Sequence, residues 1–162
     1  MNPPAKLSEL IDCLDFESEF SSRYFDRKTG LVVTVEKSLL QALENDDEAA
    51  LEDLPEWEKE DIELAREIIN DDGPEDRFID PPDKFEFHEY RQMEHFIGTL
   101  TDTVAIEQLS QAIRGKGAFR YFKDTLDRLG LRDQWFSFRD SALKKSVLRW
   151  ASANNVTVDE SR

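Results

Sequence analysis

The two histidines, His88 and His95, are the side chains best suited to acid/base or metal chemistry. They stand seven positions apart, which on one helix is about 10.5 Å of rise. That separation is too large for a shared metal ion, whose ligands lie near ~2 Å. The zinc-protease pattern requires histidines four apart. An acid/base role for His88 or Glu94 would need partners from another element, and we expect both histidines at the surface or at an interface.

Other catalytic and cofactor motifs are missing from the sequence. It contains no G-x-S-x-G elbow, no phosphate-binding Walker loop and no G-x-G-x-x-G segment. The single cysteine, Cys13, excludes an internal disulfide and a multi-cysteine metal site. The acidic clusters lack the spacing of an EF-hand. We therefore predict no cofactor, no metal site and only a weak case for an enzyme.

A short basic segment at residues 113–123, IRGKGAFRYFK, is the most distinctive constellation. Two glycines flank a lysine directly before an expected helix, and the free amides of a helix N-terminus attract anions. Three interpretations stay open: an anion site, a protein-binding corner, or a helix–helix corner whose cations pair with the acidic part of the chain. The candidate binding residues are Arg114, Lys116, Arg120, Lys123 and, more distant, Arg139.

Charge is unevenly distributed along the 162 residues, whose net charge is −15. Residues 1–95 hold 28 Asp and Glu against 10 Lys and Arg, and the run 44–76 holds sixteen acids against two bases. Residues 109–150 hold ten bases against four acids. Either the two faces pair within the molecule, or the basic segment binds an anionic partner. The net charge disfavours nucleic acid, because phosphates repel such a surface on average.

Length and composition indicate a folded protein of about one domain. Eleven Phe, three Tyr and three Trp are too many aromatic residues for a disordered acidic chain. No apolar run approaches the ~20 residues of a membrane span, and the N-terminus lacks the apolar core of a signal peptide. We expect a cytoplasmic protein with no membrane contact.

Hydrophobic spacing predicts helices and a small sheet in the N-terminal half. A helix is expected after Pro4, then a β-hairpin over 20–35 with Asp26 and Gly30 in its turn, Gly30 at positive φ. A further helix is expected over 37–46, and another with Asp53 as its cap and Trp57 in its buried stripe. Residues 77–79, before two prolines, are the best candidate for a third strand.

The C-terminal half has a helical pattern throughout. Phe119, Phe122, Leu126 and Leu129 form a regular stripe, and both phenylalanines are expected to be buried. The predicted fold class is α+β, a small antiparallel sheet packed with about six or seven helices, the C-terminal part all helical. We expect one domain over residues 1–155, with an acidic α+β part (1–85), a helical part (86–155) and a flexible tail (156–162).

Several strings of the chain are familiar: LPEWEKEDIELAREI at 54–68, FHEYRQMEHF at 87–96, IRGKGAFRYFKDTLDRLGL at 113–131 and the W-x-x-F-R-D run at 135–140. With the KLSELIDCL start and the YFDRKTGLVV hairpin, they make the chain resemble a bacterial family known as uncharacterised protein family 0158. The resemblance implies a bacterial cytoplasmic protein and supports the order of elements. It assigns no activity and no catalytic residue.

Taken alone, the sequence favours a non-enzymatic binding or regulatory domain that contacts an anionic partner through the basic segment. That partner is an acidic protein surface, a nucleotide or, less favoured, a nucleic acid. The alternative is an enzyme acting on a phosphorylated small molecule, with His88 or Glu94 as the acid/base group. The oligomeric state is not readable from the sequence.

Overall fold

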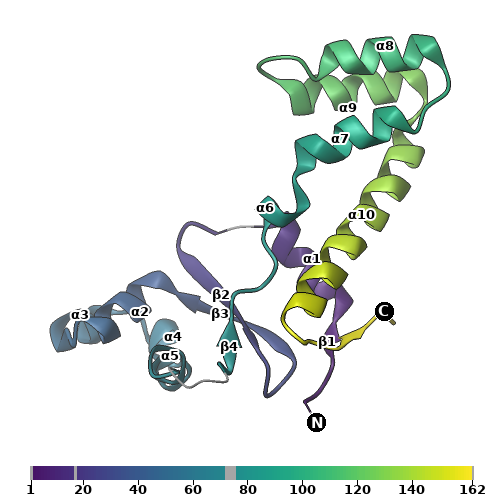
Figure 1. Ribbon diagram of the computed structural model, residues 1–162. Helices are drawn as coiled ribbons and strands as arrows, with labels where there is room; N and C mark the ends of the chain where they lie inside the picture. Colours follow the sequence, from purple (N-terminus) through teal and green to yellow (C-terminus); the bar gives the residue numbers. More distant parts are fainter. Residues whose placement is uncertain (1, 17, 72–75, 162) are drawn as a thin grey trace. The chain divides into compact units, whose positions relative to one another are not determined.

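The computed structural model describes residues 2–16, 18–71 and 76–161, and the chain forms two compact units (Figure 1). The first unit comprises Met1–Pro82 together with Leu148–Arg162, and the second comprises Asp83–Val147. The long helix α10 (Arg132–Ala153) contributes residues to both units. Helices accompany a small antiparallel sheet, so the α+β class is confirmed.

A three-stranded antiparallel sheet of order β3-β2-β4 lies in the first unit. β2 (Ser21–Asp26) pairs with β3 (Leu31–Glu36) from Ser21 opposite Glu36 to Asp26 opposite Leu31. β4 (Phe78–Ile79) pairs with the other edge of β2. The predicted hairpin and third strand are therefore both confirmed.

The hairpin turn forms as its residue types predict. The Lys28 amide donates a 2.9 Å hydrogen bond to Asp26 Oδ1, and Gly30 has φ +73°. A Cβ atom at Gly30 would lie 2.9 Å from the carbonyl oxygens of Pro3 and Pro4. Glycine is thus required here by its backbone conformation and also by the close approach of the N-terminal segment.

Short helices complete the first unit. α2 and α5 pack together around Val35, Leu39, Leu40 and Ala65. The helices are α1 (Leu7–Asp15), α2 (Lys37–Glu44), α3 (Glu48–Asp53), α4 (Glu56–Lys59) and α5 (Ile62–Ile69).

The prediction of a helix capped by Asp53, with Trp57 in its buried stripe, is wrong on both points. Asp53 ends α3, and Pro55 stands at the N-cap of α4 without a side-chain cap. Trp57 is 59% exposed, whereas Glu58 is buried and accepts a 3.1 Å hydrogen bond from Ser38 Oγ. Because the helix breaks between α4 and α5, a single 3.6-residue stripe cannot be projected across the whole segment.

The two chain ends meet in a short parallel pair. β1 (Ala5–Lys6) pairs with β5 (Val158–Asp159), and the Ala5 amide donates to the Thr157 carbonyl at 2.8 Å. β5 lies within residues 156–162, for which a flexible tail is predicted. The pairing joins positions more than 150 residues apart, which no local sequence pattern indicates.

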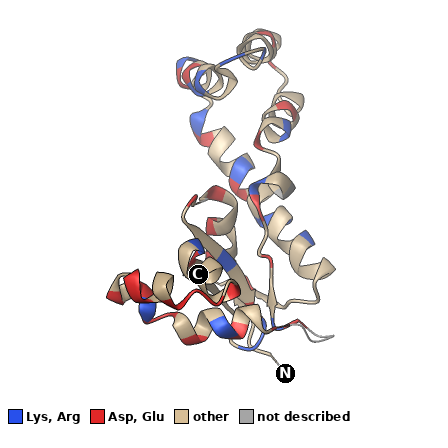
Figure 2. Cartoon of the chain, turned by 90° about the vertical axis from the view of Figure 1, so that its left-hand side faces the viewer, with Lys and Arg blue, Asp and Glu red and all other residues tan. Residues whose placement is uncertain are grey.

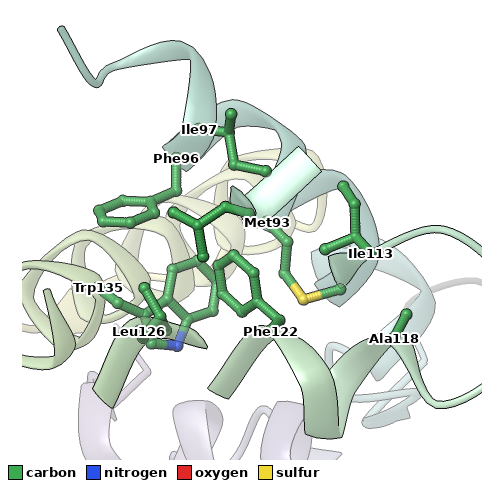
Figure 3. Packing of buried hydrophobic residues seen from close by; sticks show 9 residues of the cluster. Met93, Phe96, Ile97, Ile113, Ala118, Phe122, Leu126 and Trp135 are labelled. Carbon is green, nitrogen blue, oxygen red and sulfur yellow. The ribbon is translucent and has the colours of Figure 1, made fainter. Parts of the chain in front are cut away.

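The second unit is entirely helical among its described residues. Phe96, Phe122 and Trp135 point toward one another at its centre (Figure 3). Their ring centroids lie 4.9–6.4 Å apart in edge-on arrangements, which stabilise beyond the area they bury. The unit contains α6 (Lys84–Phe87), α7 (Glu89–Gly98), α8 (Thr103–Ala112), α9 (Ala118–Leu129) and the first part of α10.

The predicted buried stripe of α9 is confirmed at Phe122 and wrong at Phe119. Phe122 and Leu126 are 1% exposed, but Phe119 is 50% exposed. Ala118 is buried in its place. At about 100° per residue, Phe119 lies at the edge of the face that carries Ala118, Phe122 and Leu126. Ala118 therefore belongs to the core cluster of the second unit, and the Phe119 ring is half exposed to solvent.

Candidate functional site

Four cationic side chains gather where α8 turns into α9, and we call them the basic corner: Arg114, Lys116, Arg120 and Lys123. All four are exposed. Within the part of the chain that the structure describes, none of them forms an ion pair with a carboxylate. Figure 2 shows the Lys and Arg segments in blue. Four cations therefore lie close together at the corner without an ion pair to any described residue.

The turn beneath the corner is held by backbone hydrogen bonds and one tyrosine. Tyr90 Oη donates a 3.0 Å bond to the Ile113 carbonyl, and the Arg114 amide donates to the Gln111 carbonyl at 3.2 Å. Gly115 and Gly117 have φ of +77° and +79°. Two left-handed residues in three let the chain reverse tightly and begin α9 at once.

The N-terminus of α9 is not capped by any described side chain. Gly117 is the N-cap residue, and its carbonyl accepts the Tyr121 amide at 2.9 Å. The amides of the first helical turn have no partner within the helix and carry partial positive charge. The Tyr121 ring lies against Gly117, since a Cβ at that position would be 3.0 Å from Tyr121 Cε2. The second glycine therefore makes room for the ring.

Two aromatic rings are exposed among the cations. Phe119 is 50% exposed and Tyr121 is 51% exposed. The Arg120 guanidinium lies 5.7 Å from the Tyr121 ring centroid, within cation–π range. Sequence reasoning missed this combination, because the spacing of Phe119 placed it in the core stripe. The alanine at position 118 is the one sequence feature that could have indicated a shifted stripe. It is a weak indication, since alanine is common on both faces of a helix.

Arg139, the fifth predicted binding residue, already has a carboxylate partner. Its Nε and Nη2 atoms donate to the two carboxylate oxygens of Glu89 at 2.8 and 3.1 Å. Its guanidinium also lies 5.3 Å from the centroid of the Phe87 ring. Such a two-point ion pair compensates the charge, so Arg139 differs from the four corner cations.

The alternative acid/base residues are both exposed. His88 has φ +53° and stands between α6 and α7, while Glu94 lies on α7. No side-chain hydrogen bond joins either of them to the described cations of the corner. The histidines occupy surface positions, as expected.

The titratable groups buried in the first unit serve its structure. Arg77 donates from Nε and Nη2 to both oxygens of Asp26, each at 2.9 Å, and from Nη1 to Glu67 at 3.1 Å. Burial raises the pKa of Asp26, but hydrogen bonds from Arg77 and from the Lys28 amide outweigh it, so the pKa lies below its ordinary value. Burial likewise raises the pKa of the Cys13 thiol, which disfavours the reactive thiolate.

Comparison with family models places the chain in a family. The model of the Uncharacterised protein family (UPF0158) matches residues 2–160. The chain belongs to this family. Comparisons with curated proteins and with solved structures gave no significant match. Membership of the UPF0158 family confirms the resemblance drawn from the sequence strings, including the segment that carries the basic corner.

No helix among the described residues is both long enough and apolar enough to cross a membrane.

Proposed function

We propose that this protein is a non-enzymatic binding domain of the bacterial cytoplasm, whose basic corner contacts an anionic partner, an acidic protein surface. The observation that carries the proposal is the set of four exposed cations without a described carboxylate partner. Cations that only stabilise a fold are usually paired or spread over a surface. Four of them within ten residues, around an uncapped helix start, form a local positive field that attracts anions.

The exposed aromatic rings favour a protein over a small anion. Phe119 and Tyr121 flank Arg120 on α9. Aromatic residues and arginine are the side chains most enriched at the centres of protein interfaces. A phosphate ion binds through charge and hydrogen bonds, so it would leave the two aromatic rings exposed.

Single-stranded nucleic acid is the second candidate, because the same rings offer surfaces on which bases stack between phosphate contacts. The total charge of −15 weighs against it, since repulsion of a long polyanion accumulates over many phosphates. The enzymatic alternative, acting on a phosphorylated small molecule, has less support. It needs an acid/base group beside the cations, and the corner itself offers none.

Fluorescence anisotropy with three labelled probes tests the proposal: an acidic peptide containing Glu and Phe, a single-stranded oligonucleotide and a nucleotide. We expect the peptide to bind best at low salt, and added salt to weaken binding by screening. The variant carrying Arg120→Glu and Lys123→Glu should lose that binding. The matched control carries Arg91→Glu and Lys145→Glu, which reverse two exposed cations elsewhere in the same unit.

Equal loss in both variants would leave only a bulk-charge effect and contradict a specific corner. A preference for the oligonucleotide would replace the protein partner by nucleic acid. If the unaltered protein binds none of the three probes at low salt, the proposal is wrong.

A further inference from the structure

A cavity in the first unit has the opposite character to the basic corner. It measures about 350 Å³ and lies between α2, α3 and α5. Its apolar lining consists of Leu43, Leu51 and Ile69, which also pack on the core of that unit. The charged lining consists of Asp46, Glu48 and Arg66. We call this cavity the acidic groove.

The charge around the groove is strongly negative. Residues 44–71 hold thirteen Asp and Glu against two Lys and Arg, and Figure 2 shows acidic segments in red over the helices of the first unit. No described ion pair involves Asp46, Glu48 or Arg66. The lining thus mixes three apolar side chains with polar ones, Asn70 among them. The apolar residues next to Asp46 and Glu48 complement an apolar side chain that is flanked by cations.

The basic corner supplies such a side chain. Phe119 is half exposed on α9, and Arg120 and Lys123 lie beside it in the sequence and one turn further along the helix. An apolar cavity of roughly 150 Å³ holds a benzene ring, so the groove has room for a phenyl side chain. Arg66 in the lining adds a cation that can face the ring.

We propose that the acidic groove of one copy of this protein receives Phe119 of a second copy, with the corner cations of the second copy facing Asp46 and Glu48 of the first. The inference rests on the proposed function and names the acidic partner of the same corner. Groove and corner are different surfaces, so the contact is heterologous. A heterologous contact gives either a closed ring or an assembly that grows as concentration rises.

A charge-swap experiment tests this pairing. The corner-reversed variant carries Arg120→Glu and Lys123→Glu, and the groove-reversed variant carries Asp46→Lys and Glu48→Lys. Sedimentation velocity over a range of protein concentrations measures association of the full chain. We expect the unaltered protein to associate, and each variant alone to associate about tenfold or more weakly, because like charges then face each other across the contact.

Mixing the two variants gives the decisive result. In an equimolar mixture, the negative corner of one variant meets the positive groove of the other, and the remaining unaltered corner and groove also match. Association should therefore return. Salt dependence is less informative, because salt screens both the local attraction and the repulsion between two copies of net charge −15.

Two further variants separate folding from contact. Asp46 has φ +49°, where lysine is strained, so Glu48→Lys alone repeats the groove reversal without that cost. Phe119→Ala keeps every charge and should still weaken association. Reversal of Asp12 and Glu19 to lysine, two exposed acids of the first unit, is the matched control and should leave association in place. Circular dichroism confirms that each variant is folded.

The outcomes also distinguish this inference from the proposed function. An unaltered protein that stays monomeric while its corner still binds the acidic peptide overturns the self-contact and leaves the proposed function standing. Failure of the mixed variants to associate overturns it as well. A monomer whose corner binds no probe overturns both.

Discussion

The two units of this protein use charge in opposite ways. The first unit carries 26 Asp and Glu against 10 Lys and Arg, and the second carries 10 against 11. Yet the strongly acidic unit has an ion pair inside its fold, between Asp26 and Arg77. The nearly neutral unit has an aromatic core and leaves four cations exposed at one corner.

This difference shows why net charge is a poor guide to a binding site. In the first unit, excess carboxylates repel one another at the surface. The carboxylate of Asp26, in β2, is 2% exposed and accepts two hydrogen bonds from Arg77, directly before β4.

In the second unit, the centre is an aromatic cluster of Phe96, Phe122 and Trp135, and edge-on ring pairs stabilise beyond the area they bury. Arg139 pairs with Glu89 within this unit, whereas the four cations of the basic corner form no ion pair with the described residues.

The largest effect should come from the aromatic core of the second unit. Phe122→Ala removes a ring that is 1% exposed and packs edge-on against Phe96 and Trp135, so we expect a loss of about 3–5 kcal/mol in the free energy of unfolding. Phe119→Ala should change that free energy by less than about 1 kcal/mol. Urea unfolding followed by circular dichroism measures both. Equal losses would contradict the contrast between the buried and the exposed ring.

The second-largest loss in the free energy of unfolding should come from breaking the ion pair of the first unit. Asp26→Ala leaves the Arg77 guanidinium without its two-point partner, and we expect a loss of about 3 kcal/mol. The partial exposure of Arg77, 29% for its side chain, keeps the effect at the lower end. Glu67→Ala removes an exposed partner of the same guanidinium and should cost less than about 1 kcal/mol. Equal effects would show that the buried pair has no special role.

The same carboxylate predicts how stability depends on pH. The pKa of Asp26 is lower in the folded protein than its ordinary value of about 3.9. Its contribution is therefore complete above that ordinary value and is lost as the pH falls below it, through the lower folded pKa. Urea midpoints measured between neutral and acidic pH should converge for the unaltered protein and Asp26→Asn at the acidic end. A constant difference would be contrary to this linkage.

A somewhat smaller effect is expected at the hairpin turn. Gly30→Val places a β-branched residue at φ +73° and its Cβ against two carbonyl oxygens, and we expect a loss of about 2 kcal/mol. Lys28→Ala changes an exposed side chain and keeps the backbone amide that bonds to Asp26, so it should stay within about 0.5 kcal/mol. Thermal unfolding of the two variants gives the comparison directly.

The smallest effect on stability should come from the basic corner. Arg120→Glu with Lys123→Glu alters exposed side chains that have no described ion pair, and the free energy of unfolding should change by about 0.5 kcal/mol or less. The same variant should lose binding of the acidic peptide. A large destabilisation would mean that the corner contributes to the fold, and the contrast between the units would disappear.

Much of the fold was readable because its signals are local. Asp26 and Gly30 predict the hairpin turn, since the Asx hydrogen bond and the positive φ lie within five residues. Gly130, at φ +71°, ends α9 where the pattern indicates. The basic corner could also be located, because glycines, cations and a helix start stand together in one segment. Family membership rests on the match of the family model to residues 2–160, a range that includes this segment.

What the tertiary structure decided involves contacts between distant residues or the exact face of a helix. The partner of Asp26 stands 51 positions away, and β1 and β5 join the two ends of the chain. Phe119 lies at the edge of a helical stripe, where a rotation of one residue decides between core and solvent. In the folded chain, Ala118 packs into the core cluster and Phe119 is 50% exposed. The packing of α9 in the second unit, and no local pattern, therefore decides that the corner presents an aromatic ring among its cations.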